Sequence, residues 1–152
     1  MELISKLFGK RVTMRQCAAL PIRRGAGGGL EVGLVTTRET KSWVIPKGWC
    51  EAGLPDEKTA ALEAYEEAGL RGTVRPEPIG TFTYRKRLHL FASLNCEVDV
   101  YVLEVTEQLD DWPERAEREV AFMPPDAAAE KVREASLAAI LRRLPRLIDR
   151  HH

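Results

Sequence analysis

The sequence predicts an α/β fold in which one β-sheet is covered by helices on both of its faces. Two observations lead to this prediction: strand-like segments lie on both sides of one early helix, and an amphipathic helical region follows the last strand. Because a helix and each face of a sheet must bury an apolar surface, helices at two places in the chain are expected to cover the two faces. The length of 152 residues fits one domain. We expect that domain to span residues 13–148, with an arm at 1–12 and a tail at 149–152.

The first two strands are predicted on either side of a glycine-rich turn. RQCAALP (15–21) and LEVGLVT (30–36) have the composition of strands, and IRRGAGGG between them is typical of a hairpin tip. A phosphate-binding loop is the alternative for this glycine run, but the run lacks the Gly-Lys-Ser/Thr ending and does not open a helix. After a polar turn at 37–42, residues 43–45 predict a short buried strand.

A loop and a helix come next. The loop PKGWCEAGLP leads to Asp56, which we expect to cap a helix over residues 57–68 by accepting a bond from a backbone N–H of the first turn. Gly69 is expected to end the helix in the left-handed conformation. Small apolar residues line one flank of this helix, so it can lie close against a sheet: Ala60, Ala61, Ala64 and Ala68.

Three carboxylates share one face of the same helix. Glu63, Glu66 and Glu67 are spaced i, i+3 and i+4, which places them within an arc of about 100°. Like charges so placed repel, and a divalent cation in front of them is the simplest compensation. Oxygen ligands favour Mg²⁺ or Mn²⁺ over zinc. The alternative is a solvated surface face, which is common on glutamate-rich helices.

The second half of the chain predicts further strands and a helical end. Residues 97–105, EVDVYVLEV, alternate clearly between apolar and polar and are the strongest strand signal in the chain. The other expected elements are a polar connection (71–77), a strand (79–84) that runs into the basic cluster Arg85-Lys86-Arg87, a loop (106–114), a short extended piece (121–123), and one or two helices after Pro124-Pro125-Asp126.

Composition excludes several classes of protein. With 23 basic and 23 acidic residues the net charge is zero, so no global field attracts nucleic acid and we expect no such partner. Neither a signal peptide nor an apolar run of membrane-spanning length is visible, which predicts a cytoplasmic protein without a membrane segment. Cys17, Cys50 and Cys96 are odd in number and widely spaced, so we interpret them as reduced thiols and Cys50 as incidental.

The stretch from Gly48 to Leu70 resembles the sequence box of the Nudix hydrolases. That box reads Gly, five residues, Glu, seven residues, Arg-Glu, an aliphatic residue, any residue, Glu-Glu, any residue, Gly and an aliphatic residue. This chain matches the box in register at Gly48, Glu63, Ala64, Glu66, Glu67, Gly69 and Leu70. The resemblance implies a mixed sheet sandwiched between helices, an α/β/α arrangement that periodicity alone does not give.

The resemblance also implies an activity and its residues. It implies hydrolysis of a diphosphate linkage in a small phosphoanhydride substrate, with Glu63, Glu66, Glu67 and the backbone carbonyl of Gly48 as ligands for Mg²⁺ or Mn²⁺. Glu63 or Glu67 is the candidate base, although relatives place that base differently. A metal is chemically required because the pyrophosphate charge must be clamped and the attacking water activated.

Two positions depart from the box. Leu54 stands where the box has its first Glu, and Leu62 stands where it has Arg. Since the replaced residues have opposite charges, we infer that an apolar pair replaces a polar pair, a joint change that can be nearly neutral for stability. The alternative is impaired catalysis in a protein that only binds its ligand.

Outside the box, the chain is similar to the branch of Nudix enzymes that act on diadenosine polyphosphates and diphosphoinositol polyphosphates. The similarity lies in LEVGLVTTRETKSWVIPKG, LEAYEEAG, TYRKR and VLEVTEQLDDWPE. From the basic residues of these and neighbouring segments we predict the substrate-binding set Lys47, Arg24, Arg38, Lys41, Arg85 and Arg87. The alternatives are an ADP-ribose-type substrate, the 5′-triphosphate end of RNA, and a catalytically silent ligand-binding module. The oligomeric state is left open.

Overall fold

A computed structural model describes residues 13–150 of the chain, with side chains to residue 148; the predicted arm at 1–12 lies outside the described residues. The strands are β1 (Thr13–Arg24), β2 (Leu30–Thr36), β3 (Trp43–Val44), β4 (Lys47–Trp49), β5 (Leu70–Val74), β6 (Gly80–His89), β7 (Ala92–Gln108) and β8 (Val120–Met123). The helices are α2 (Asp56–Ala68), α3 (Pro125–Lys131) and α4 (Ala135–Arg150).

Strand β1 lies at the centre of the single mixed sheet. One of its edges pairs in parallel with β7, from Thr13 opposite Asn95 to Ile22 opposite Glu104. Its other edge is shared, because β4 pairs antiparallel with the first half of β1 and β2 with its last residues. Strand β7 is also shared, by β6 along its first half and β5 along its second. The short strand β4 is therefore attached directly to the central strand.

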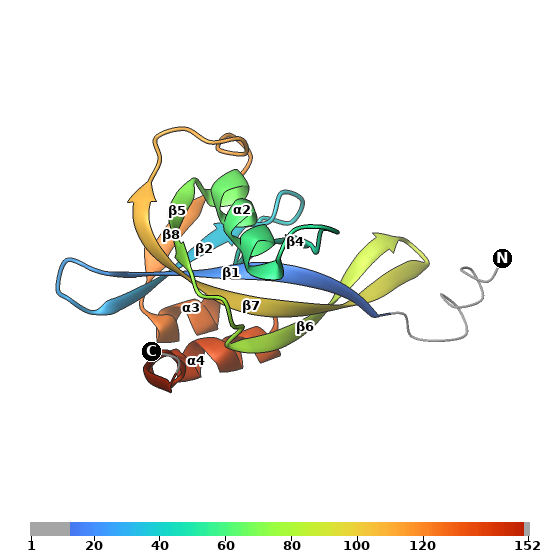
Figure 1. Ribbon diagram of the computed structural model, residues 1–152. Coiled ribbons are helices and arrows are strands. Elements are labelled where there is room, and N and C mark those ends of the chain that lie inside the picture. Colours follow the sequence, from blue (N-terminus) through green and yellow to red (C-terminus); the bar gives the residue numbers. More distant parts are fainter. Residues whose placement is uncertain (1–12, 151–152) are drawn as a thin grey trace.

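Two apolar layers hold helices against the two faces of the sheet. Helix α2 covers one face, while α3 and α4 lie together beneath the other (Figure 1). The layer under α2 is thin and built from small residues such as Ala60, Ala64 and Ala68, with Leu70 and Leu103 beside them. The other layer is the main core, in which the strands pack against buried leucines and isoleucines of α4. The predicted α/β/α class is confirmed.

Two segments that we expected to be irregular form strands. Residues 47–49 of the predicted loop are β4, which pairs Gly48 with Cys17 of β1. Residues 70–74, expected to begin a polar connection, are the edge strand β5, which pairs with the end of β7. Both are short and exposed in part, so they lack the apolar alternation by which a strand is recognised in a sequence.

The start of α2 differs from the prediction. Helix α2 begins one residue earlier than expected, at Asp56, and Pro55 occupies the cap position with no side-chain bond to the helix. The Asp56 carboxylate instead accepts a bond from the Arg15 guanidinium at 3.0 Å, and the same guanidinium reaches Asp99 at 2.7 Å. An ion pair between β1, β7 and the helix thus replaces the expected cap.

The end of α2 is as predicted. Gly69 has a φ of 66°, and its N–H donates to the carbonyl of Tyr65, which is how a glycine commonly closes a helix. The Trp112 ring lies over this glycine so closely that a side chain at position 69 would overlap it. The indole Nε1 donates to the carbonyl of Glu67 at 3.2 Å. The connection between β7 and β8 therefore covers the last turn of the helix.

Replacing Gly69 with Ala is expected to destabilise the fold by about 2–4 kcal/mol, because left-handed strain adds to the displacement of Trp112. Chemical denaturation measures this change. Gly53→Ala is the matched control, since Gly53 also has a positive φ, of 82°, but has no atom near its added Cβ. The control should lose only the strain part, about 1–2 kcal/mol. Equal losses in the two variants would mean that Trp112 does not constrain position 69.

Among the described residues, the helices are all too short or too polar to span a membrane.

Candidate functional site

The glutamate face of α2 lies against the backbone of β4. A Cβ placed on Gly48 would lie 2.6 and 2.7 Å from the two carboxylate oxygens of Glu63, closer than real contacts allow. The Glu63 carboxylate therefore occupies the space that a side chain at position 48 would fill. The match at Gly48 has a local physical reason, because only glycine lets the carboxylate approach the main chain here.

Glu67 is a buried carboxylate with one weak ion-pair partner. The residue is 6% exposed, and one of its oxygens lies 3.9 Å from a guanidinium nitrogen of Arg118. Arg118 is itself held more tightly elsewhere, by Glu114 at 2.6 Å and by the carbonyl of Thr36 at 3.0 Å. Arg118 is thus positioned independently of Glu67 and neutralises it only in part.

Burial raises the pKa of both inner carboxyl groups. It raises the pKa of Glu67 to about 8, with attraction from Arg118 acting against the shift and repulsion from Glu63 adding to it. Burial also raises the pKa of Glu63, and the nearby charges of Glu66, Glu114 and Glu51 add to that effect, while a hydrogen bond with Glu67 opposes it. Without a bound cation, Glu67 therefore holds a proton at neutral pH.

This donor set fits a hard divalent cation. It offers carboxylate oxygens from Glu63, Glu66 and Glu67 and a backbone carbonyl at Gly48, and such oxygen ligands suit Mg²⁺ or Mn²⁺. The raised pKa values of Glu63 and Glu67 indicate that bound positive charge would favour the ionised forms of both groups. The structure thus places Gly48 and Glu63 in contact where α2 meets β4, with Glu66 and Glu67 on the same face of α2 as Glu63.

The pKa of Glu67 predicts how metal and pH together set stability. In the unfolded chain this carboxyl has an ordinary pKa near 4.5, and in the metal-free fold its pKa is about 8. Between these values the folded state holds a proton that the unfolded state has released, so stability falls as pH rises. We expect the metal-free protein to melt several degrees lower at pH 8.5 than at pH 5.5, and Mg²⁺ to raise Tm more at pH 8.5 than at pH 6.

Calorimetry with EDTA or with excess Mg²⁺ measures both trends. The wild type should be compared with Glu67→Gln, since other groups such as Lys47, whose pKa burial lowers, also titrate at high pH. The difference between the two proteins isolates Glu67. A metal-free difference curve that is flat from pH 5.5 to 8.5 would contradict the raised pKa.

Lys47 lies at the edge of this site on the opposite face of β4. Its ammonium is 5.0 Å from the centre of the Tyr84 ring, and the Tyr84 hydroxyl donates to Gln16 at 2.6 Å. Burial lowers the pKa of Lys47, the charges of Glu67 and Glu134 oppose that shift, and the charge of Lys86 adds to it. The charge of Glu67 therefore acts on Lys47, and that of Lys47 on Glu67.

The other predicted substrate-binding residues lie at separate places. Arg38 and Lys41 are exposed in the turn before β3, where Arg38 pairs with Glu117 at 3.5 Å. Arg85 and Arg87 point to one face of β6 and line a cavity of about 360 Å³ at the β6–β7 hairpin. Strand alternation puts Lys86 on the other face with Tyr84, so Lys86 rather than its neighbours lies near Lys47.

Arg24 lies far from Arg85 along the sheet. It ends β1, whereas Arg85 is level with the start of β1 through the pairing with β7. At the rise of an extended strand, the two levels are about 36 Å apart. The structure therefore does not bring Arg24 and Arg85 to one site, and the hairpin tip that follows Arg24 is a plain turn closed by Gly25 and Gly29.

Two side chains near the glutamate face were not predicted from the sequence. Arg118 and Glu114 both come from the β7–β8 connection, which also bonds its backbone N–H at Glu114 to the carbonyl of Glu66 at 3.0 Å. They lie far along the chain from α2, and no local spacing or composition marks them. Only the passage of this connection over the end of the helix reveals them.

The inferred contact between Leu54 and Leu62 stays a prediction. Both side chains are half-buried. If they touch, introducing Glu at 54 and Arg at 62 together should cost less than the sum of the single changes, by about 0.5–3 kcal/mol. Denaturation of the two single variants and the double variant measures this coupling, and simple additivity would count against contact.

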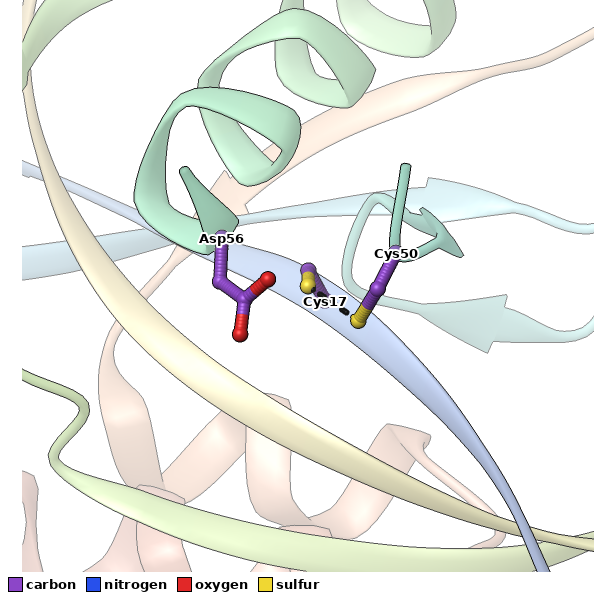
Figure 2. A group of neighbouring side chains, drawn as sticks. All are labelled: Cys17, Cys50 and Asp56. Atoms are coloured by element: carbon purple, nitrogen blue, oxygen red, sulfur yellow. Dashed lines mark hydrogen bonds between the residues drawn. The ribbon is translucent and has the colours of Figure 1, made fainter. Parts of the chain in front are cut away.

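A separate cluster lies beside the glutamate face. The Sγ atoms of Cys17 and Cys50 are 2.6 Å apart, and the Asp56 carboxylate lies next to them, as Figure 2 shows. Among residues 13–148, these three side chains form the group whose possible metal-ligand atoms (thiol, carboxylate or imidazole) all lie within 4.8 Å of one another. Thiols are poor ligands for Mg²⁺, so this cluster does not replace the glutamate face as a site for that ion.

Comparison with known proteins identifies the family of the chain. A family model described as NUDIX domain matches residues 14–144. The chain is 35% identical to Nudix hydrolase 12, mitochondrial, of Arabidopsis thaliana over 107 residues, which are 68% of this chain and 53% of that protein. It is 39% identical to diphosphoinositol polyphosphate phosphohydrolase 2 of Rattus norvegicus over 83 residues, 54% of this chain and 42% of that protein. The chain thus spans about half the length of the curated relatives it matches.

Solved structures share the fold. A C. elegans Ap4A hydrolase binary complex superposes with a TM-score of 0.69 at 16% identity, over 90% of this chain and 98% of that one. The E. coli ORF135 protein gives 0.65 at 14% identity, over 92% and 94% of the two chains. Because the family model spans nearly all of the described residues, and a curated relative of the same family is 35% identical, the chain belongs to the NUDIX domain family.

Proposed function

We propose that the protein is a metal-dependent pyrophosphohydrolase that cleaves a diphosphate linkage in a nucleoside polyphosphate or a diphosphoinositol polyphosphate. The observation that carries the proposal is the contact between Glu63 and Gly48, with Glu66 and Glu67 on the same helix face. Family membership supports the reaction class, and the names of the relatives support the type of substrate.

Each residue of the site has a proposed task. Gly48, Glu63, Glu66 and Glu67 would hold Mg²⁺ or Mn²⁺, which when bound supplies positive charge for the diphosphate oxygens and lowers the pKa of a water. Lys47 presents an ammonium at the edge of the same site and is the proposed partner of a substrate phosphate. The small apolar layer under α2 keeps the helix close to the sheet, which fixes the carboxylates relative to β4.

Glu63 and Glu67 are the two candidates for the general base. A general base must be ionised before it can accept a proton, and burial raises the pKa of Glu67 to about 8 only without metal; bound positive charge would favour its ionised form. Glu63 lies closer to the β4 backbone and is the second candidate. The family places this base differently among its members, so we assign it to the pair.

Charge around the site supports a polyphosphate substrate. Lys47 and Lys86 lie on one face of the sheet, while Arg38 and Lys41 come from the turn before β3. We propose these residues as the main phosphate contacts, with Arg85 and Arg87 at the hairpin as contacts for a longer substrate. Arg24, at the last position of β1, stays a predicted contact of the substrate.

A cytoplasmic location is proposed on composition alone. The names of the relatives differ in this respect: Nudix hydrolase 12 of Arabidopsis thaliana is named as mitochondrial, whereas the name of Nudix hydrolase 4 of the same plant gives no compartment. Imaging of the full-length protein with a C-terminal fluorescent tag tests the proposal, and accumulation in an organelle would overturn it.

A substrate panel tests the function. Phosphate release should be measured with diadenosine tetraphosphate, a diphosphoinositol polyphosphate, ADP-ribose and a 5′-triphosphate RNA, each with Mg²⁺, Mn²⁺ or EDTA. We expect hydrolysis of diadenosine tetraphosphate or of the diphosphoinositol polyphosphate with Mg²⁺ or Mn²⁺, and no hydrolysis with EDTA. Turnover confined to ADP-ribose or RNA would move the assignment to those alternatives. A ligand that raises Tm without metal while nothing is hydrolysed would favour the silent binding module and overturn the hydrolase proposal.

A further inference from the structure

The cysteine pair beside the site is not explained by the proposed hydrolysis. Cys17 lies in the middle of β1 and is fully buried, whereas Cys50 is half-buried and directly follows β4. Since Cys17 pairs with Gly48 across the two strands, Cys50 is its diagonal neighbour, two residues further along. Figure 2 shows the two side chains pointing toward each other, with Asp56 at the start of α2 beside them.

The distance between the two sulfur atoms distinguishes the possible roles. Two thiolates that bind one zinc ion at about 2.3 Å in tetrahedral geometry are about 3.8 Å apart, and the 2.6 Å found here is much shorter. A disulfide needs about 2.05 Å, so the sulfurs must move about 0.6 Å closer to bond. The carboxylate that would complete a metal site is already bound by Arg15 at 3.0 Å.

A disulfide between Cys17 and Cys50 would link β1 to the end of the short strand β4. Strand β4 is held to β1 by only three paired residues, and the chain then leaves the sheet as the loop at 51–55. Gly48, whose backbone contacts Glu63, lies in this strand. A covalent link at Cys50 would fasten β4 where the ladder ends.

We propose that Cys17 and Cys50 form a reversible intramolecular disulfide, a redox modification site that fastens β4 to β1 beside the start of α2. Hydrogen peroxide is the oxidant class. Its O–O bond breaks as Cys50 becomes a sulfenic acid and one water is released. The Cys17 sulfur then attacks the Cys50 sulfur, the S–O bond breaks, and the departing oxygen leaves as a second water that carries the thiol proton. A dithiol reductant reverses the change by thiol–disulfide exchange.

Oxidation of the full-length protein tests the proposal. The reduced chain contains three cysteines. After mild peroxide treatment we expect one titratable thiol in denaturant, a mass lower by about 2 Da, and a Cys17–Cys50 peptide after digestion. Closing the loop between these residues should raise Tm by about 5–10 °C, and a reductant should reverse the rise.

Two variants serve as controls. Cys96→Ala keeps the pair and should still lose both of its remaining thiols, whereas Cys50→Ser should keep its thiols and show no rise in Tm. A stable sulfenic or sulfinic acid on Cys50 without the 2 Da loss, or disulfide-linked dimers, would overturn the proposal. Stoichiometric binding of Zn²⁺ that Cys50→Ser abolishes would overturn it in favour of a metal site.

The consequence for turnover rests on the proposed function, and the disulfide itself does not. Because the sulfurs move little, Gly48 and Glu63 keep their places, and we expect the oxidised and reduced proteins to differ in kcat by less than about twofold. A reduced protein that hydrolyses nothing would count against the proposed function and leave the thiol, mass and Tm results unaffected. An oxidised form that loses most of its activity would contradict the small movement of the sulfurs from which the unchanged kcat is expected.

Discussion

Glu67→Gln is expected to lower kcat/KM by about 10²–10³-fold while leaving the fold intact, since the several kcal/mol that a metal-bound centre contributes to the transition state would be lost. The amide keeps the size of the side chain and removes a buried charge, so the metal-free variant should melt at or above the wild-type temperature above pH 8. Arg118 keeps its bonds to Glu114 and Thr36, so the substitution leaves no unpaired buried guanidinium.

Steady-state kinetics at several Mg²⁺ concentrations, together with isothermal titration of Mn²⁺, measures the loss. The matched control is Glu57→Gln, which removes a carboxylate from the first turn of the same helix, away from the glutamate face. The control should keep activity within about twofold. Undiminished turnover in Glu67→Gln and in Glu66→Gln would refute the assignment of these residues as ligands.

Gly48→Ala is expected to reduce activity by about 10–100-fold with little change in stability. The added methyl group would occupy the place of the Glu63 carboxylate, which is the end of a flexible side chain and can swing away at low cost. Stability is therefore kept, whereas the displaced carboxylate no longer faces its partners, and misplacement of a reacting group by about 1 Å can cost this much in rate.

Kinetics and thermal melting of the same samples separate the two effects. Gly27→Ala in the β1–β2 hairpin is the control, because its added Cβ would have no neighbour within 4 Å. It should leave both activity and Tm near the wild-type values. A Gly48→Ala protein with full activity would mean that Glu63 does not act from its position beside β4, whereas a large drop in Tm would mean that the backbone moved instead of the side chain.

The parts of the site that could be predicted are those that local chemistry determines. The spacing of Glu63, Glu66 and Glu67 defines a helix face regardless of what packs against it, and Gly69 ends that helix by its own conformational freedom. The register of the box tied Gly48 to the same face, and the structure gives the physical contact behind it. Local signals also predicted β2 and β8 closely.

The parts that could not be predicted depend on long-range pairing. Strands β4 and β5 exist because β1 and β7 offer them a free edge, and their own residues carry little strand signal. Asp56 was expected to cap α2, but its carboxylate forms an ion pair with Arg15 of β1 instead. The cysteines appeared unrelated in the sequence for the same reason, since only the pairing of β1 with β4 brings Cys17 to Cys50.

The placement of β1 has a consequence for synthesis of the chain on the ribosome. The long parallel ladder of β1 needs β7, whose first paired residue, Asn95, is made after the whole of β4 and α2. A nascent chain released only as far as β6 therefore carries every proposed metal ligand but has no partner for one edge of its central strand. Such an unpaired apolar edge invites association with other chains. Pulse-labelled truncations ending before and after β7 should differ sharply in aggregation, with the shorter ones depending on chaperones.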